Sequence, residues 1–518
     1  MLHFQSTFRP QFFRISPKVE EYPVLIDELK KNIELLNEEQ IDASILEYID
    51  PSLGTFARVF VPQRVFQKNP QIEPYRDWLV KNQENNTVLR AEFTEFLPCL
   101  FLPIQPTDNV LIINQKEGVS TQFILDQISS GVIVSNITDI KKQRNKINGD
   151  TSKLVTISYP PEKIPEFPSK FDKILCNPPN TRDGALHNSP GQESSWKIDN
   201  SIPMHQIQKK TLIRSLQLLN VGGYCVYTTD SFSPYENEAV INTVLKSLDG
   251  AVEIVDCTEV YPEIDRKQGL TKWKTDVFDD DPNQETEASI SPAELVDGIN
   301  NCMRFYPQQI YDNGIFIAVL KKNNDFAYDP LNEEVDVKDQ YTVTDVSIID
   351  NYINFFGLNE EIRTMNFLSQ ETLNIANVFY ISDNLLQFLN GLDISKLKIC
   401  FIGQKAFSYA VKYPEEAPIP SVETIPAAMR NPSKRVLTLS LNGFKAIVAS
   451  QNRIEIQHLS EGIIRDMSNM QTGGIYIEIE GYGIITGALW KAPYIRLLNK
   501  KNITEKEVRI VEAALSSK

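Results

Sequence analysis

The sequence contains few cysteines and no long apolar run. Its six cysteines in 518 residues are scattered without the paired spacing of a disulfide framework or a zinc site, so we expect neither, and no bound metal. Scattered single cysteines are typical of reducing compartments, and we therefore expect an intracellular protein, nuclear or cytoplasmic. No apolar run reaches the roughly 18 residues of a membrane-spanning helix, so no membrane association is expected.

Positive charge is also in deficit. The chain has 52 lysines and arginines against 68 acidic residues, a formal net charge of −16. Phosphate contacts supply most of the affinity of a broad nucleic-acid-binding surface, so this balance disfavours such a surface, and we expect no DNA partner. Local RNA contacts remain open at two basic clusters, for which a solvated face is the alternative. These clusters are Lys141, Lys142, Arg144 and Lys146, and Lys500, Lys501, Lys506 and Arg509.

Hydrophobic periodicity divides the chain into four parts. Residues 1–105 mix short strands with helical stretches such as residues 25–36, which indicates an α+β region. Residues 106–325 alternate apolar strand-like runs with helices, and this pattern predicts a doubly wound α/β sheet. Residues 326–360 are polar and acidic, and we expect a linker there. Residues 361–518 carry short alternating runs between turns, which predict a small β-barrel.

Two segments carry the strongest functional signal. They are FDKILCNPPNTRDGA at residues 171–185 and GGYCVYTTDSFSPYENEAV at residues 222–240. They resemble the D-x-P-C-S-G-x-G and T-C-S-x-x-x-x-E-x-E motifs of the Sun-domain (NOL/NOP/Sun, RsmB-like) RNA cytosine-5 methyltransferases, transfer-RNA branch. In that family a cysteine thiolate adds to C6 of cytosine, which makes C5 nucleophilic, and a second cysteine helps to release the product. Asn180 and Asp230 stand at the two cysteine positions, so the resemblance implies a catalytically degenerate member.

Two cysteines lie near these motifs, but they do not restore the chemistry. Cys176 and Cys225 lie inside apolar strand-like runs, four or five residues before the motif positions, and we expect both to be buried. Several motif remnants survive around them, for which a structural role competes with a catalytic one. An Asp-Gly turn that shapes the loop, structural hydrogen bonds and loop orientation are the favoured interpretations. These remnants are Asn177, Pro179, Asp183, Gly184, His205, Gln208, Glu236 and Glu238.

The resemblance places an S-adenosylmethionine site after the first core strand. The family has D-x-C-A-A-P-G-x-K-T there, and of this motif Ile112–Thr121 retains Gly118 and Thr121. Asn136 stands where a carboxylate normally binds the ribose, and Pro160 where an acidic residue meets the adenine. From these changes we expect no cofactor, and S-adenosylmethionine only if the chain is an active enzyme with divergent motifs.

A second methyltransferase motif competes for the same loop. Asn177–Asn180 resembles the N-P-P-aromatic motif of amino methyltransferases, in which the Asn side chain and a Pro carbonyl hold the target nitrogen. Asn180 replaces the aromatic residue, so the stack on the base is lost. We therefore regard an amino methyltransferase as the weaker alternative.

The resemblance to the transfer-RNA branch extends along the chain, through residues 61–102, the GLTKW stretch at 269–273 and residues 303–320. It implies a Rossmann-like methyltransferase core followed by a barrel like the pseudouridine-synthase-associated (PUA) domain. Trp196 and Lys197 are candidates to line an RNA channel, or to cap a helix approach. Two roles remain open for a degenerate member: binding a transfer RNA, or pairing with a protein partner such as an active paralogue.

Overall fold

The structure is a computed structural model of the whole chain. It describes residues 10–19, 21–84, 87–115, 118–137, 147, 149–188, 200–273, 295–327, 341–371, 375–410, 418–421, 432–468, 470, 472–498, 508 and 511–512. These form two compact units. The first comprises Met1–Leu79, Val88–Ile147 and Thr156–Glu334, and the second comprises Val80–Thr87, Asn148–Val155 and Val335–Lys518. Among the described helices, none is both long and apolar enough to cross a membrane.

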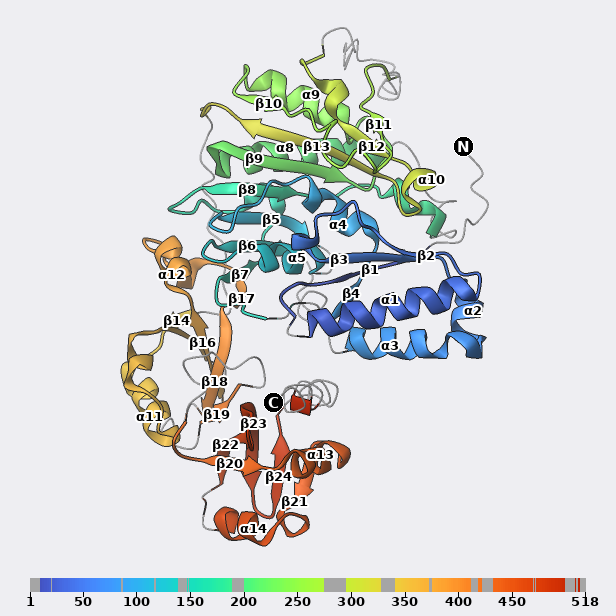
Figure 1. The fold of residues 1–518 in the computed structure, drawn as a ribbon. Coiled ribbons are helices and arrows are strands. Elements are labelled where there is room, and N and C mark those ends of the chain that lie inside the picture. Colours follow the sequence, from blue (N-terminus) through green and yellow to red (C-terminus); the bar gives the residue numbers. More distant parts are fainter. Residues whose placement is uncertain are drawn as a thin grey trace. The chain divides into compact units, whose positions relative to one another are not determined.

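The first unit begins with a four-stranded antiparallel sheet that carries helices on one face (Figure 1). The strand order is β2-β3-β1-β4. Apolar side chains of α1 and α3 pack with alternate residues of the strands into one core. The elements are β1 (Gln11–Ile15), α1 (Tyr22–Glu38), β2 (Ala43–Ile45), β3 (Thr55–Val59), α2 (Gln63–Lys68), α3 (Glu73–Glu84), β4 (Val88–Arg90) and α4 (Phe93–Leu100).

Alternation along β3 explains how this sheet joins the rest of the unit. Ala57 and Val59 belong to the core beneath the helices. Phe56 points the other way, and its ring lies 5.3 Å from that of Phe96 and 6.2 Å from that of Phe123. Successive strand side chains face opposite sides, so the small sheet is buried on both faces.

A buried ion pair strengthens the same junction. Arg14 of β1 contacts Asp126 of α5 (Val119–Gln127) at 2.7 Å, and both side chains are almost fully buried. The Arg14 Nε atom also donates to the Leu53 carbonyl at 2.7 Å, and its guanidinium lies 4.8 Å from the Phe123 ring centroid. Two buried charges that satisfy each other fix the position of β1 on the core.

The larger sheet of the first unit has the strand order β11-β12-β13-β9-β8-β5-β6-β7, and β10 also pairs with β13. The pairs β5–β6, β5–β8 and β8–β9 are parallel, and β13 is antiparallel to β9. The prediction of a doubly wound α/β sheet is confirmed. The further elements are β5 (Val110–Gln115), β6 (Ile133–Ile137), β7 (Leu154–Ile157), β8 (Phe171–Cys176), α8 (Ser201–Leu218), β9 (Leu219–Thr229), α9 (Glu238–Ser247), β10 (Val252–Ile254), β11 (Lys267–Gln268), β12 (Met303–Phe305), α10 (Pro307–Ile310) and β13 (Ile315–Lys322).

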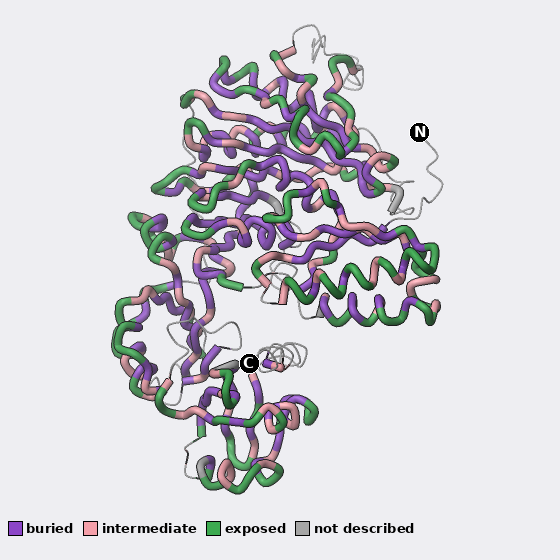
Figure 2. The backbone as a smooth tube through the Cα atoms, viewed as in Figure 1, coloured by how far each residue is buried: buried purple, intermediate pink, exposed green. Residues whose placement is uncertain are grey.

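The strand order reverses between β5 and β8. From β5 the chain builds outward through β6 and β7, and from β8 it builds the other way through β9 and β13. These central strands are largely buried, as the mostly purple colouring of their tube shows in Figure 2. In open α/β sheets, ligands bind outside the carboxyl ends of the strands at such a reversal. The functional site is therefore expected where β5 and β8 end.

The second unit contains two five-stranded sheets, in the orders β14-β15-β16-β18-β19 and β20-β22-β23-β24-β21. Residues 361–518, for which a small barrel is predicted, contribute all of these strands except β14, and the structure arranges the strands as two sheets with short helices. The elements are β14 (Tyr341–Val343), α11 (Val346–Phe356), β15 (Asn366–Glu371), β16 (Ile375–Ile381), α12 (Asp383–Leu389), β17 (Ile399–Ile402), β18 (Gln404–Ala410), β19 (Ile419–Pro420), β20 (Val436–Leu439), α13 (Leu441–Ala449), β21 (Arg453–Glu455), α14 (Glu461–Ser468), β22 (Gly473–Ile479), β23 (Gly483–Lys491) and β24 (Tyr494–Leu497).

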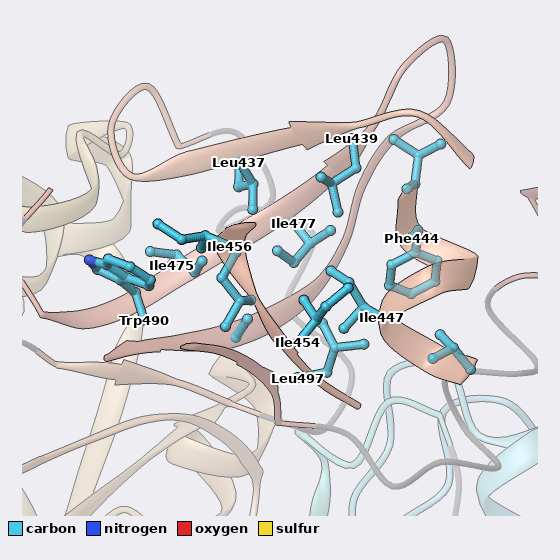
Figure 3. Packing of buried hydrophobic residues seen from close by; sticks show 14 of the residues in the cluster. Leu437, Leu439, Phe444, Ile447, Ile454, Ile456, Ile475, Ile477, Trp490 and Leu497 are labelled. Atoms are coloured by element: carbon cyan, nitrogen blue, oxygen red, sulfur yellow. The ribbon is translucent and has the colours of Figure 1, made fainter. Parts of the chain in front are cut away.

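The last sheet has a core of its own. Figure 3 shows Leu437 and Leu439 of β20, Ile475 and Ile477 of β22 and Trp490 of β23 packed around the same space. The Trp490 indole N–H donates to the Met470 carbonyl at 2.8 Å, which satisfies the one polar atom of this side chain.

The linker predicted for residues 326–360 was wrong in its second half. This stretch contains β14 and α11. Asp345 caps the helix through the Ser347 N–H at 2.8 Å, and the buried Ile349, Ile353 and Phe356 recur at helical spacing. The preceding acidic run obscured this amphipathic pattern in the sequence.

Candidate functional site

A cavity of about 550 Å³ opens where β5, β8 and β9 end, at the strand-order reversal. One wall comes from these strands and the other from β1, the end of β4 and α4. Its size is that of a site for a small ligand. The lining residues are Pro10, Gln11, Phe12, Arg90, Ala91, Glu92, Thr94, Glu95, Pro98, Ile112, Ile113, Ser120, Leu175, Asn177, Arg182, Thr228, Asp230, Asp312 and Ile315.

The loop after β8 is closed by its own side chains. The Asn180 Nδ2 atom donates to the Pro178 carbonyl at 3.0 Å and approaches Asn177 Oδ1 at 3.5 Å. Its Oδ1 atom accepts the Arg182 N–H at 3.1 Å. The Pro179 carbonyl accepts from Gln208 at 3.0 Å. Both polar ends of the Asn180 side chain therefore shape the loop.

Asp230 follows directly after β9 and faces the cavity. Its side chain is 14% exposed, and its Oδ2 lies 3.5 Å from the Nε of Arg182. At the position that the resemblance assigns to the second cysteine, the structure thus has the carboxylate of Asp230 beside the guanidinium of Arg182.

No cysteine is found among the described residues that line this cavity. Cys176 and Cys225 are fully buried within β8 and β9. A hydrogen bond with Cys176, together with burial, raises the pKa of the Cys225 thiol well above its usual value. Burial likewise raises the pKa of Cys99, on α4 behind the cavity, to about 12. Neither Cys225 nor Cys99 is therefore a ready source of thiolate at neutral pH.

Two buried glutamates hold the loops around the site. Glu236 is fully buried and accepts five hydrogen bonds. Its donors are the N–H and hydroxyl of Thr181, the hydroxyls of Ser201 and Ser231, and the Gln208 amide. Glu238 pairs with Arg304 at 2.6 Å and accepts the Leu270 N–H at 2.8 Å. These contacts give both residues positions that order the loops rather than positions at the cavity.

The Asp183-Gly184 pair ties the loop to neighbouring strands. Asp183 accepts the Phe232 N–H at 2.8 Å, and burial raises the pKa of its carboxyl to about 6. The Gly184 N–H donates to the Asp230 carbonyl at 2.8 Å, and the Gly184 carbonyl accepts the Gly314 N–H at 2.9 Å. A Cβ at Gly184 would lie 2.3 Å from the Gly314 oxygen, so the approach requires glycine.

His205 also has a structural position. Its Nδ1 lies 2.6 Å from the Tyr235 carbonyl, and burial lowers its pKa. The ring is on α8 and is not among the residues that line the cavity.

The residues that the resemblance assigns to the cofactor site differ in whether their geometry suits a bound cofactor. Gly118 lies between β5 and α5 with φ of +84°, a conformation that favours glycine, and it directly precedes the N-terminus of α5. The Thr121 hydroxyl is buried against that of Ser135 at 3.3 Å. Asn136 donates to the Tyr159 carbonyl at 2.9 Å and accepts the Tyr159 N–H at 2.8 Å, next to Pro160. The residues present therefore fit the methionine end of a methyl donor, whereas Asn136 joins two segments instead of offering a ribose ligand.

Several predicted RNA-binding residues lie outside the described residues. They are Lys141, Lys142, Arg144, Lys146, Trp196, Lys197, Lys500, Lys501, Lys506 and Arg509. Conversely, the wall formed by Phe12, Arg90, Glu92 and Asp312 was not anticipated, because only the tertiary fold brings these separate segments to the cavity. In the part of the chain that the structure describes, no cluster of metal-binding side chains occurs.

Residues 100–321 match the family of the 16S rRNA methyltransferase RsmB/F. The multisite-specific tRNA:(cytosine-C(5))-methyltransferase trm4b of Schizosaccharomyces pombe is 28% identical over 338 residues, covering 54% of this chain and 48% of the relative. The tRNA (cytosine(34)-C(5))-methyltransferase of Drosophila melanogaster is 27% identical over 316 residues, covering 53% and 42%. This chain thus spans less than half the length of these relatives.

Solved structures of low sequence identity share parts of the fold. A structure of NSun6 from Pyrococcus horikoshii with SFG is 15% identical, with a TM-score of 0.41, and covers 61% of this chain and 92% of that chain. A methyltransferase homologue from the same organism is 20% identical, with a TM-score of 0.41, and covers 61% and 87%.

The prediction that the chain uses no cofactor was wrong. The matching family and the relatives are named as methyltransferases, whose reaction takes a methyl group from a donor. The prediction rested on the motif residues that the sequence lacks. It gave too little weight to the glycine turn of the motif, which is retained at Gly118.

Proposed function

Because its central part, residues 100–321, belongs to the Sun-domain family of RNA cytosine-5 methyltransferases, we propose that this chain binds transfer RNA beside a methyl-donor site without the family's thiol nucleophile. One observation carries the proposal. Asp230, which lines the cavity, occupies one family cysteine position, and Asn180, in the loop after β8, occupies the other with both polar ends of its side chain bonded within that loop. Transfer RNA is the proposed ligand because three relatives of 27–28% identity are named as transfer-RNA methyltransferases.

The chemistry explains why the substitution at Asp230 matters. Cytosine becomes reactive at C5 after a nucleophile has added to C6, and a thiolate performs this addition far better than a carboxylate. The Asp230 carboxylate is also beside Arg182, which stabilises its negative charge. The site can therefore hold a base without activating it.

The donor half of the proposal depends on the turn at Gly118. S-adenosylmethionine supplies an electrophilic methyl group when it is bound. The backbone N–H groups at the start of α5, the Gly118 turn and the apolar side chains of Ile112 and Ile113 would hold its methionine end.

The contacts of Asn180 argue against an amino methyltransferase. In that class the Asn side chain and the Pro carbonyl of the motif accept hydrogen bonds from the target amine. Here the Asn180 Nδ2 atom itself approaches Asn177 Oδ1 and donates to the Pro178 carbonyl. The side chain thus occupies the position that a target amine would need.

Covalent trapping tests the absence of a nucleophile. We expect no denaturant-resistant complex between the wild-type chain and transfer RNA that contains 5-fluorocytosine, in the presence of S-adenosylmethionine. Asp230→Cys supplies a thiol at the same position and should acquire such a complex, whereas Asp230→Ser should not. Gel electrophoresis under denaturing conditions distinguishes the three chains. A complex with the wild-type chain would mean that another nucleophile serves and that the chain is an active enzyme.

Calorimetric titration with S-adenosylmethionine tests the donor site separately. We expect binding by the wild-type chain and its loss in Gly118→Val, because a β-branched residue is strained at a φ of +84°. The matched control is Gly222→Val, which creates the same strain at the same φ of +84° near the start of β9, at the end of that strand remote from Asp230. This control should bind the donor like the wild-type chain. Equal heats for Gly118→Val and the wild-type chain would remove the Gly118 turn from the donor site.

A further inference from the structure

An arginine and two aromatic rings form a partly exposed cluster beside the cavity. The Arg58 guanidinium lies 5.0 Å from the ring centroid of Phe60 and 5.6 Å from that of Tyr311. The two rings meet edge to face, with centroids 5.2 Å apart and planes at 88°. The three residues come from β3, the residue after it and the end of α10, so the fold brings together segments that are far apart in the sequence.

Tyr311 is unusual in both exposure and backbone conformation. Its side chain is 47% exposed, and its φ of +56° places a bulky residue in the left-handed region. Glycine or asparagine would adopt this conformation with less strain. Because the Tyr311 ring is about half exposed, its packing in the fold stabilises the protein only slightly. Residues held in strained conformations concentrate at ligand sites, which makes Tyr311 a candidate for a contact outside the chain.

The cluster adjoins the cavity on two sides. Arg58 pairs across the sheet with Phe12, and Asp312 directly follows Tyr311. Both Phe12 and Asp312 line the cavity. If one unit of a polymer enters the cavity, a neighbouring unit would therefore lie near the side chains of Arg58, Phe60 and Tyr311.

The charges around the cluster favour an anionic polymer. Among the described residues Arg58 has no ion pair, and its Nε has no hydrogen-bond partner. The two nearby acids on the cavity wall are engaged within the fold: Asp312 accepts the Thr94 N–H at 3.0 Å, and Glu92 accepts from Asn313. The arginine is thus the charge that the cluster offers to a ligand.

We propose that Arg58, Phe60 and Tyr311 form a stacking platform for an unpaired RNA base next to the nucleotide that reaches the cavity. The proposal rests on the proposed function, since it assumes that RNA is the ligand. Aromatic rings stack on any base, and an arginine adds both a planar surface and a contact with phosphate.

Tyr311→Gly tests the platform without threatening the fold, because glycine removes the ring and also relieves the left-handed strain. With fluorescently labelled unfractionated transfer RNA, we expect its Kd to rise about 5- to 100-fold, the range for one lost base–aromatic stack. Tyr311→Phe keeps the ring and should bind like the wild-type chain. The melting temperature of Tyr311→Gly should equal or exceed that of the wild-type chain, which shows that any lost affinity is not lost folding.

Arg58→Gln gives an independent readout. Removal of one phosphate contact should lower the magnitude of the slope of log K against log salt by about 0.7 to 0.9. If the wild-type chain binds transfer RNA and both Tyr311→Gly and Arg58→Gln leave affinity and slope unchanged, the platform is overturned and the proposed function stands. If the wild-type chain does not bind transfer RNA, both proposals fail.

Discussion

At the scale of single residues, the carboxylates near the loop after β8 differ in how the fold balances their charge. Glu238 has the guanidinium of Arg304, whereas within the described part of the chain Glu236 has five hydrogen-bond donors and no cation. Asp183 has the Phe232 N–H, yet burial outweighs its hydrogen bonds and raises its pKa to about 6. Ionisation of Asp183 by neutral pH therefore costs free energy of folding.

Asp183→Asn should stabilise the protein at neutral pH. The folded pKa is above the ordinary value of 3.8, so the contribution of Asp183 is most favourable below about pH 4 and is lost as the pH rises through 6. A shift of about two units corresponds to roughly 3 kcal/mol above pH 7. Asparagine cannot ionise and keeps an oxygen for the Phe232 N–H. Calorimetric melting at pH 4.5 and pH 7.5 should show a gain for the variant at the higher pH. The same change at both pH values would refute the shift.

The sequence showed which residues occupy the motif positions, but it could not show which partner each side chain contacts. The absence of cysteine at Asn180 and Asp230 follows from the letters alone. The role of Asn136 does not, because its partner is the backbone of Tyr159, and backbone partners leave no mark in a motif. Tyr311 also gave no signal, since a left-handed φ at tyrosine has no sequence signature.

At the scale of elements, α11 and β22 meet through a pair of buried tyrosines. The Tyr352 and Tyr476 hydroxyls share a hydrogen bond, and the Tyr352 ring stacks on Phe407 with centroids 4.0 Å apart. Burial raises the pKa of both phenols, so both remain neutral donors and acceptors. This pair joins the two sheets of the second unit.

Tyr352→Phe should destabilise the second unit by about 1–3 kcal/mol, since it leaves the Tyr476 hydroxyl buried without this partner. The double variant Tyr352→Phe/Tyr476→Phe removes both polar groups and should recover most of that loss. Urea denaturation followed by fluorescence would compare the three chains. The single variant Tyr476→Phe completes the cycle, and a loss in the double variant equal to the sum of the two single losses would show that the hydroxyl pair contributes no coupling energy.

The elements themselves were largely predictable. The buried strands of the central sheet are apolar runs, and their alternation with helices gave the doubly wound order. The helix α11 was missed although its apolar residues have helical spacing, because the neighbouring acidic residues dominated the composition of the stretch. Strand pairing in the second unit could not be predicted, since it depends on contacts between residues far apart in the chain.

At the scale of the whole molecule, the net charge of −16 limits how RNA can bind. A broad phosphate-binding surface is disfavoured, so affinity must come from a few local contacts. Replacement of Lys141, Lys142, Arg144 and Lys146 by Glu should weaken transfer-RNA binding and flatten its salt dependence, with each lost contact changing the slope by about 0.7 to 0.9. Filter binding at several salt concentrations measures both effects. Unchanged binding after this charge reversal would exclude these four residues as contacts for transfer RNA.

The ion pair between Arg14 and Asp126 bears on the kinetics of ligand entry. One cavity wall is built on β1 and the other on the large sheet, and this buried pair joins β1 to α5. Removing one partner of such a buried pair costs on the order of 3–5 kcal/mol, because the other charge is left uncompensated, and we therefore expect the two walls to stay joined. A ligand should therefore enter a gap that already exists, and its observed association rate should rise linearly with ligand concentration instead of reaching a plateau set by an opening step.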